Sequence, residues 1–273
     1  CSFALFLLCM SAFTTKQEAF AMPTAERETL KQRLKTLRLV KVGEVLDEFS
    51  QKAAKAKWSY TEFFNRLMEE EYLAKGERSR NIRVKDAKFP DLKLLADFDF
   101  KAQPALNEKQ IKELASLSFI DQKENIVFLG QPGVGKTHLA TAIGINACQA
   151  GYRVLFINAH KLMSKLSGSL YTETLNTTLA DLTKYHLIIV DEFGYLPVKE
   201  DQANAFFQLI ARKYEKTSLI MTSNLNFDQW GKVFGNEVLA AAILDRLLHH
   251  CHVIQINGDS YRLKAKKRKD GDN

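Results

Sequence analysis

Residues 130–137 read Gly-Gln-Pro-Gly-Val-Gly-Lys-Thr, and an apolar run at 126–129 directly precedes them. The stretch that follows, 138–150, has the pattern of a helix. The three glycines allow backbone amides to turn inward around an anion, and the helix presents the positive end of its dipole to the same place. Sequence and context therefore predict a P-loop, the turn between a strand and a helix that binds nucleotide phosphates.

Each polar side chain of this turn has an expected task. Lys136 neutralises the β- and γ-phosphates, and the Thr137 hydroxyl ligates Mg²⁺. A chance match to such a pattern is expected in roughly one chain in a hundred of this length, so coincidence is a weak alternative. The expected cofactors are ATP and Mg²⁺, and the residues expected to contact the nucleotide are Gly130, Gln131, Pro132, Gly133, Val134, Gly135, Lys136, Thr137 and His138.

A second apolar run, 187–190, delivers the carboxylates Asp191 and Glu192 at its end. Ligands of open α/β sheets bind at the carboxyl ends of the strands. We expect Asp191 to hold the magnesium ion and Glu192 to polarise the attacking water as a general base. An Asp-Glu pair after a strand is often only a helix N-cap, but the P-loop upstream favours the catalytic interpretation because phosphoryl transfer needs a metal-holding acid.

Two further polar residues are candidates for catalysis. Asn224 ends the tripeptide Thr-Ser-Asn after the apolar run 219–221, where it could reach the γ-phosphate or the water. By itself this tripeptide is ordinary turn chemistry. Arg246 lies in the helix-like stretch 240–248 and is either a solvated side chain or an arginine finger delivered across a subunit interface.

After residue 107, short apolar runs alternate with helical stretches. Such alternation predicts an α/β fold of the P-loop NTPase type, with a parallel five-stranded sheet flanked by helices. The N-terminal part differs: 24–49 has helical periodicity as one helix or a pair, and a further helix begins at Ser59, capped by the Ser59 hydroxyl and Glu62. The five expected strands are 126–129, 154–157, 187–190, 219–221 and 253–256.

These patterns divide the chain into five segments. A segment at 1–21 precedes Met22, lacks the charged region of a secretory signal, and is interpreted as non-native or translated upstream sequence. A small helical domain for binding DNA or a partner follows at 22–75. A basic linker at 76–106 is either a solvated connector or a contact to the DNA backbone. The ATPase domain covers 107–263, and a basic tail 264–273.

The amino-acid composition narrows the range of possible partners and cellular locations. With 39 Lys and Arg against 32 Asp and Glu, the net charge of +7 favours a polyanionic partner such as nucleic acid without proving one. The four cysteines form no Cys-x-x-Cys pair, so we expect reduced thiols and a cytoplasmic protein. The run His249-His250-Cys251-His252 invites a metal interpretation, but we expect a strand there, whose alternate side chains would point to opposite faces. No stretch has the apolar length of a membrane span.

Over about 29–263 the chain resembles the IstB-like helper ATPases of insertion-sequence transposition, relatives of the DnaC-type helicase loaders within the AAA+ class. Two features depart from the family pattern: Phe193 stands where Leu is usual, and residues 1–21 have no counterpart. The motifs that carry the resemblance are A-K-F-P at 87–90, D-F-D-F at 97–100, the P-loop with its flanks at 124–140, D-E-F-G-Y-L-P at 191–197, T-S-N-L-N-F-D-Q-W at 222–230, A-A-A-I-L-D-R-L-L-H-H at 240–250 and G-D-S-Y-R-L-K at 258–264.

The resemblance implies ATP-dependent homo-oligomerisation on duplex DNA and engagement of a transposase. We expect DNA binding to have little sequence preference, because basic residues of the linker and tail would contact phosphates. It assigns phosphate and magnesium binding to the P-loop, hydrolysis to Asp191 and Glu192, a sensor role to Asn224 and a finger role to Arg246. Arg262 is added as a residue that faces the nucleotide or a neighbouring subunit. The alternatives are a replicative helicase loader with the same core, a nucleotide switch with negligible turnover, and a small-molecule kinase, which lacks support because no acceptor-binding insert is visible.

Overall fold

The computed structural model describes residues 23–195, 197–258 and 260–261. Segments 1–21 and 264–273, together with Arg262, lie outside the described residues. The chain forms two compact units, Cys1–Arg78 and Ser79–Asn273, and each is treated by itself below.

The first unit contains helices α2 (Thr24–Thr36) and α3 (Val40–Ala56) and the beginning of α4 (Tyr60–Asp86). Of the two predictions for residues 24–49, one helix or a pair of helices, the structure shows the pair. Ser59 Oγ accepts a hydrogen bond from Glu62 N at 3.2 Å, which confirms the predicted capping by the Ser59 hydroxyl, whereas the Glu62 carboxylate pairs with Arg66. Helix α4 continues through 76–86, where we expected a linker, because no Gly or Pro interrupts the helix-forming residues after Gly76.

A small apolar cluster holds the first unit together. Val42 and Val45 of α3 pack on Leu67 of α4, and partly buried apolar side chains surround them. Buried Glu71 of α4 accepts a hydrogen bond from Val42 N at 3.1 Å, so a side chain of one helix satisfies a free amide in the first turn of another.

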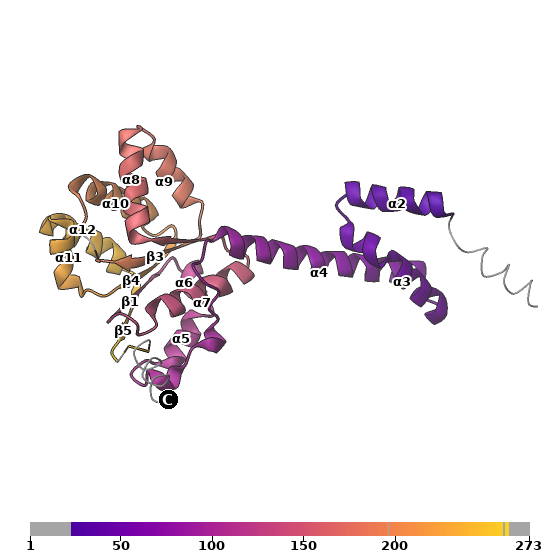
Figure 1. Ribbon diagram of the computed structural model, residues 1–273, viewed down its shortest axis with the longest axis horizontal. Coiled ribbons are helices and arrows are strands. Elements are labelled where there is room, and N and C mark those ends of the chain that lie inside the picture. The colour runs from indigo at the N-terminus through magenta and orange to yellow at the C-terminus, as the bar shows by residue number, and fades with distance from the viewer. Residues whose placement is uncertain (1–22, 196, 259, 262–273) are drawn as a thin grey trace, which may run out of the picture. The chain divides into compact units, whose positions relative to one another are not determined.

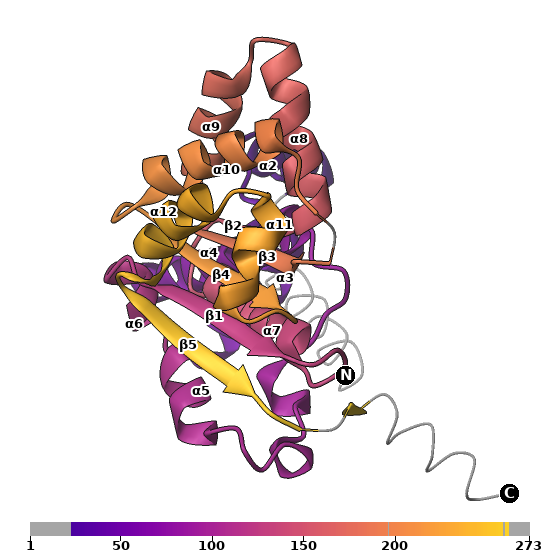
Figure 2. The same ribbon diagram turned by 90° about the vertical axis from the view of Figure 1, so that its left-hand side faces the viewer.

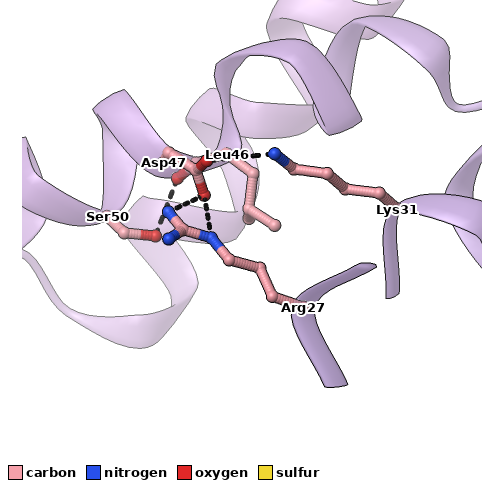
Figure 3. Close-up of polar contacts among 5 residues, drawn as sticks. All are labelled: Arg27, Lys31, Leu46, Asp47 and Ser50. Carbon is pink, nitrogen blue, oxygen red and sulfur yellow. Dashed lines mark hydrogen bonds and ion pairs between the residues drawn. The ribbon is translucent and has the colours of Figure 1, made fainter. Parts of the chain in front are cut away.

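Polar contacts join α2 to α3 at the surface of this unit. Figure 3 shows Arg27 and Lys31 of α2 converging on Asp47 of α3, with Arg27 Nε 2.7 Å from Asp47 Oδ1 and Lys31 Nζ 3.1 Å from Oδ2. In the same view Ser50 Oγ donates to the carbonyl oxygen of Leu46. Exposed ion pairs contribute little to stability, so the apolar cluster does most to hold the helices together.

The second unit is built on a five-stranded sheet in the order β2-β3-β4-β1-β5, with every pairing parallel (Figures 1 and 2). This confirms the predicted α/β class and the five predicted strands. Their bounds are β1 Asn125–Gly130, β2 Val154–Asn158, β3 Leu187–Phe193, β4 Ser218–Ser223 and β5 Cys251–Ile256.

Helices cover both faces of the sheet, and alternate strand residues supply two apolar cores (Figure 1). In β1, Ile126 and Phe128 face one core while Val127 and Leu129 face the other, as the period of a strand requires. The first core contains α5 (Glu108–Leu114), α6 (Ser118–Asp121) and α7 (Lys136–Gln149). The second contains α8 (Ala159–Tyr171), α9 (Leu175–Thr183), α10 (Glu200–Lys213), α11 (Trp230–Phe234) and α12 (Glu237–Leu248).

The segment after α4 covers the edge strand β2. Phe156 N donates to the carbonyl oxygen of Ala87 at 2.7 Å, and the rings of Phe89 and Phe156 meet edge to face with centroids 6.0 Å apart. Arg83 Nε also donates to the carbonyl oxygen of Cys148 at the end of α7. The contacts satisfy part of a strand edge that would otherwise be open to pairing with another chain.

Our expectation that residues 249–252 lie in one strand is wrong for two of the four. Helix α12 extends to Leu248, His249 caps it, and β5 begins only at Cys251. Asn125 sets this boundary, because its side-chain amide donates to the carbonyl oxygen of Leu247 and its backbone amide donates to that of His250. His249 and His250 therefore share a turn between helix and strand.

Both cysteines in the described part of the chain, Cys148 and Cys251, are free thiols. Burial raises the pKa of Cys148 to about 11 and that of Cys251 to about 12. The two thiols therefore stay protonated at neutral pH and are poor nucleophiles. Within the described ranges no helix combines the length and the apolar character needed to cross a bilayer.

Gly144 offers a test of how α7 packs on the sheet. A Cβ atom at this position would lie 2.6 Å from Ile189 Cδ1 and 2.8 Å from Phe89 Cε1. Gly144→Val is therefore expected to lower the free energy of unfolding by about 1–3 kcal/mol, measured by urea denaturation. Gly168→Ala is the control, because nothing lies within 4 Å of its Cβ position in α8. Equal stability of the two variants would contradict the close packing of α7.

Candidate nucleotide-binding site

The predicted P-loop joins β1 to α7 as a tight turn at the carboxyl edge of the sheet. Gly133 and Gly135 have φ of +85° and +105°, which other residues rarely adopt. A Cβ on Gly133 would collide with the Ser260 hydroxyl, and one on Gly135 would lie 2.6 Å from the ring of Phe98. Glycine is needed at both places for backbone conformation and for space.

The Lys136 ammonium group lies inside this turn. Its Nζ donates to the carbonyl oxygens of Gly130 at 2.6 Å and Gln131 at 2.9 Å, and the residue is buried. A positive charge is thereby placed among the backbone amides at the start of α7, where the helix dipole also favours an anion.

Asp191 is the polar centre of the site. The buried carboxylate accepts a hydrogen bond from the Thr137 hydroxyl at 2.9 Å and another from the Thr222 hydroxyl at 2.5 Å. Residues from the P-loop, β3 and β4 thus meet at one point. The donor set of one carboxylate and adjacent hydroxyl oxygens fits Mg²⁺, which prefers oxygen ligands and keeps several waters.

Glu192 lies at an irregularity in β3. Pairing of β3 with β4 shifts between Val190 and Phe193, and Glu192 has φ of +62°. Its backbone amide donates to Thr222 Oγ1 at 3.0 Å, which holds the bulge in place. The side chain is exposed, and Asn158 Nδ2 donates to its Oε2 at 2.6 Å.

A cleft of about 690 Å³ opens over these groups. Glu192, Thr222 and Ser223 line it from the strand ends, and residues of the P-loop line it as well. A further wall comes from the segment 90–103, which includes the short 3₁₀ helices η1 (Leu95–Asp97) and η2 (Phe100–Ala102).

The cleft wall at 90–103 is fixed to the start of α7. His138 Nε2 lies 2.8 Å from the carbonyl oxygen of Leu94, and the rings of His138 and Phe98 meet edge to face with centroids 5.2 Å apart. We had assigned this segment to a basic linker. The aromatic residues of its D-F-D-F motif were the available signal for a structured wall.

Sequence reasoning also missed Asn158 and Thr222. Both lie at the carboxyl ends of strands that flank β3, Asn158 as the last residue of β2 and Thr222 as the last but one of β4, and each contacts one residue of the acidic pair. The order of strands in the sheet would have identified them, since polar residues at neighbouring carboxyl ends converge.

Two predicted residues make no hydrogen bond to this cluster and do not line the cleft. Asn224 is partly buried just after β4; the cleft is lined by Thr222 and Ser223, and Asn224 Oδ1 has no hydrogen-bond partner within the described chain. Arg246 stacks on the ring of Phe207 at 4.9 Å and donates to the carbonyl oxygen of Ala242. It lies beside Asn125 and Leu219, at the amino ends of β1 and β4, so it is distant from the P-loop of its own chain.

The chain was compared with known families and structures. The family model described as IstB-like ATP binding protein matches residues 32–269. An ATP-binding protein of insertion sequence IS21 from Pseudomonas aeruginosa is 44% identical over 235 residues, covering 86% of this chain and 89% of the relative. An ATP-binding protein of insertion sequence IS5376 from Geobacillus stearothermophilus is 47% identical over 209 residues, covering 77% and 83%.

Among solved structures, the DnaC helicase loader superposes with a TM-score of 0.52 at 17% identity, covering 62% of this chain and 99% of the loader. At this identity the likeness concerns the fold alone. The family match covers most of the chain, and the alignments with the two relatives cover 89% and 83% of their lengths. This chain therefore belongs to the IstB-like ATP-binding protein family.

Proposed function

We propose that this protein is a Mg²⁺-dependent ATPase that assembles on duplex DNA, uses ATP to control that assembly, and recruits or stimulates a transposase during insertion-sequence transposition. The observation that carries the ATPase part is the hydrogen bond from Thr137 to Asp191, since Thr137 also lines the cleft that Glu192 lines. The names of the relatives, which are insertion-sequence ATP-binding proteins, support the transposition part.

The residues divide the work of hydrolysis among them. Lys136 and the amides of the P-loop bind the phosphates, and Thr137 and Asp191 hold the metal. A Mg²⁺ ion held there supplies a Lewis acid that offsets charge on the phosphoryl oxygens. Glu192 accepts a proton from the attacking water once its carboxylate is free of Asn158. Asn224 remains the candidate sensor at the end of β4.

Arg246 fits a role between subunits. It is too far from its own P-loop to act there, so a finger role requires a neighbouring copy. This requirement supports the proposal that the active form is a homo-oligomer. Arg262 remains a second candidate for the same interface.

Basic side chains support DNA binding. Arg80, Lys85, Lys88 and Lys93 are exposed on and after the end of α4, and the whole chain carries +7. Such residues contact phosphates and do not read base edges, so binding is expected to depend little on sequence and to weaken steeply with salt.

The experiment that tests this function is ATPase activity with and without duplex DNA, combined with sizing of the nucleotide-bound protein. We expect DNA to change the turnover and Mg-ATP to produce a larger assembly, with DNA affinity falling as salt rises. The proposal would be contradicted if duplex DNA left the ATP turnover unchanged and Mg-ATP left the size of the protein unchanged. Co-purification with a hexameric helicase in place of a transposase would instead indicate a helicase loader.

Asn158 yields a prediction about the resting rate. Its amide engages Glu192 Oε2, while its Oδ1 caps α8 by accepting from His160 N. Asn158→Ala is expected to raise basal ATP turnover about fivefold. The substitution removes a hydrogen bond of roughly 1 kcal/mol that engages the Glu192 carboxylate, so this carboxylate is more often free to accept a proton from water. Turnover under saturating Mg-ATP without DNA is the measurement.

Asn107→Ala is the matched control for the lost cap. Asn107 caps α5 in the same way, by accepting from Gln110 N at 3.2 Å, and it does not contact Glu192. Its turnover should equal that of the unaltered protein. A lower rate in Asn158→Ala than in Asn107→Ala would show that the amide assists catalysis and does not restrain Glu192.

A further inference from the structure

His249 and His250 lie where the second unit brings two helix ends together. His249 caps α12, His250 follows it, and Glu215 lies two residues after the end of α10. The rings of the two histidines have centroids 4.1 Å apart. Among the residues that the structure describes, these three are the one group of three His, Cys, Asp or Glu side chains whose ligand atoms lie within 4.8 Å of one another.

We propose that Glu215, His249 and His250 form a binding site for a divalent transition-metal ion, with Zn²⁺ as the best match. Zinc bonds of about 2.0–2.1 Å to nitrogen place two tetrahedral ligands roughly 3.3 Å apart. His250 Nε2 lies 3.5 Å from Glu215 Oε1, and His249 Nδ1 lies 4.0 Å from the same oxygen. Small side-chain rotations therefore bring the three groups to bonding distance.

The chemistry of the donors selects the ion. Two imidazoles and one carboxylate suit Zn²⁺, Ni²⁺ or Cu²⁺, whereas Mg²⁺ and Ca²⁺ prefer oxygen alone. The site is thus different in kind from the magnesium site at Thr137 and Asp191. All three side chains are about half exposed, which leaves room for water as a fourth ligand.

The surroundings favour a cation at this place. The carboxyl end of α12 presents the negative end of the helix dipole to His249. Tyr214 OH lies 2.8 Å from His249 Nδ1, and an ion bound to this nitrogen would replace that hydrogen bond.

Two cationic side chains that line a small pocket with Glu215 are engaged elsewhere. Arg246 stacks on Phe207, and Lys213 Nζ donates to the Thr217 hydroxyl at 2.7 Å. An ion at Glu215, His249 and His250 would therefore tie the end of α10 to the end of α12, the helix that carries Arg246.

The test is a Zn²⁺ titration of the full-length chain by calorimetry, with visible absorption of bound Co²⁺ as a second readout. We expect one ion per chain with nitrogen and oxygen ligation, and affinity reduced about tenfold or more in His250→Ala and in Glu215→Gln. Thermal unfolding of each variant without metal verifies that it is folded.

His252→Ala is the control, because His252 Nε2 is paired with Glu124 at 2.7 Å and lies in β5. It should bind Zn²⁺ like the unaltered chain. The proposal is overturned if the unaltered chain takes up no Zn²⁺, if His252→Ala loses as much affinity as His250→Ala, or if Co²⁺ absorption shows thiolate ligation. These readouts do not involve ATP, so they stand apart from the ATPase proposal.

Discussion

Glu192→Gln is expected to retain ATP binding and to lower ATP turnover by about 10²–10⁴-fold, the usual contribution of a general base. The amide keeps the shape of the side chain and can still contact Asn158, but it cannot accept a proton from water. The exposed position of Glu192 means that the substitution costs little stability. Phosphate release at saturating Mg-ATP measures the rate, and equilibrium titration measures binding.

Glu108→Gln is the control for a lost carboxylate. Glu108 forms an exposed pair with Lys112 at 2.7 Å on α5, so its replacement should leave turnover unchanged. Unaltered phosphate release in Glu192→Gln would remove the role assigned to this residue. Loss of binding together with turnover would instead assign it to nucleotide affinity.

Lys136→Ala is expected to weaken ATP binding by about 10²-fold or more. A buried ammonium in the turn forms charge-assisted hydrogen bonds with phosphates, each contributing about 1.5–3 kcal/mol. The substitution also removes its bonds to the carbonyl oxygens of Gly130 and Gln131, which hold the turn in shape. Titration with a fluorescent ATP analogue measures the affinity.

Lys184→Ala controls for the loss of one positive charge. Lys184 pairs with Asp181 at the surface at 2.6 Å, and this substitution should leave affinity as it was. If Lys136→Ala bound ATP as tightly as Lys184→Ala, the turn at 130–137 would not be the phosphate site.

Much of the fold could be predicted from the sequence, because the patterns that indicate it involve residues close together in the chain. The P-loop has a fixed spacing, and continuous apolar runs separated by helices permit few arrangements other than a covered parallel sheet. Ser59 and Glu62 likewise predicted the start of α4 correctly, since a cap depends on residues three positions apart.

The parts that sequence did not reveal depend on contacts distant in the chain. Asn158 meets Glu192 across 34 positions, and Thr222 meets Asp191 across 31, so neither pair has a local pattern. The turn at His249 and His250 was taken for strand because Asn125, more than a hundred residues earlier, determines where α12 ends. In each case tertiary contacts override the local pattern.

The central claim is that a nucleoside triphosphate and its metal are held between the P-loop and the acids at 191 and 192. Calorimetric titration of the unaltered protein with ATP, in Mg²⁺ and again in excess chelator, tests it most directly. We predict one ATP bound per chain, with clearly tighter binding in Mg²⁺ because Thr137 and Asp191 hold the ion. Absence of ATP uptake, or equal affinity with and without Mg²⁺, would contradict this account.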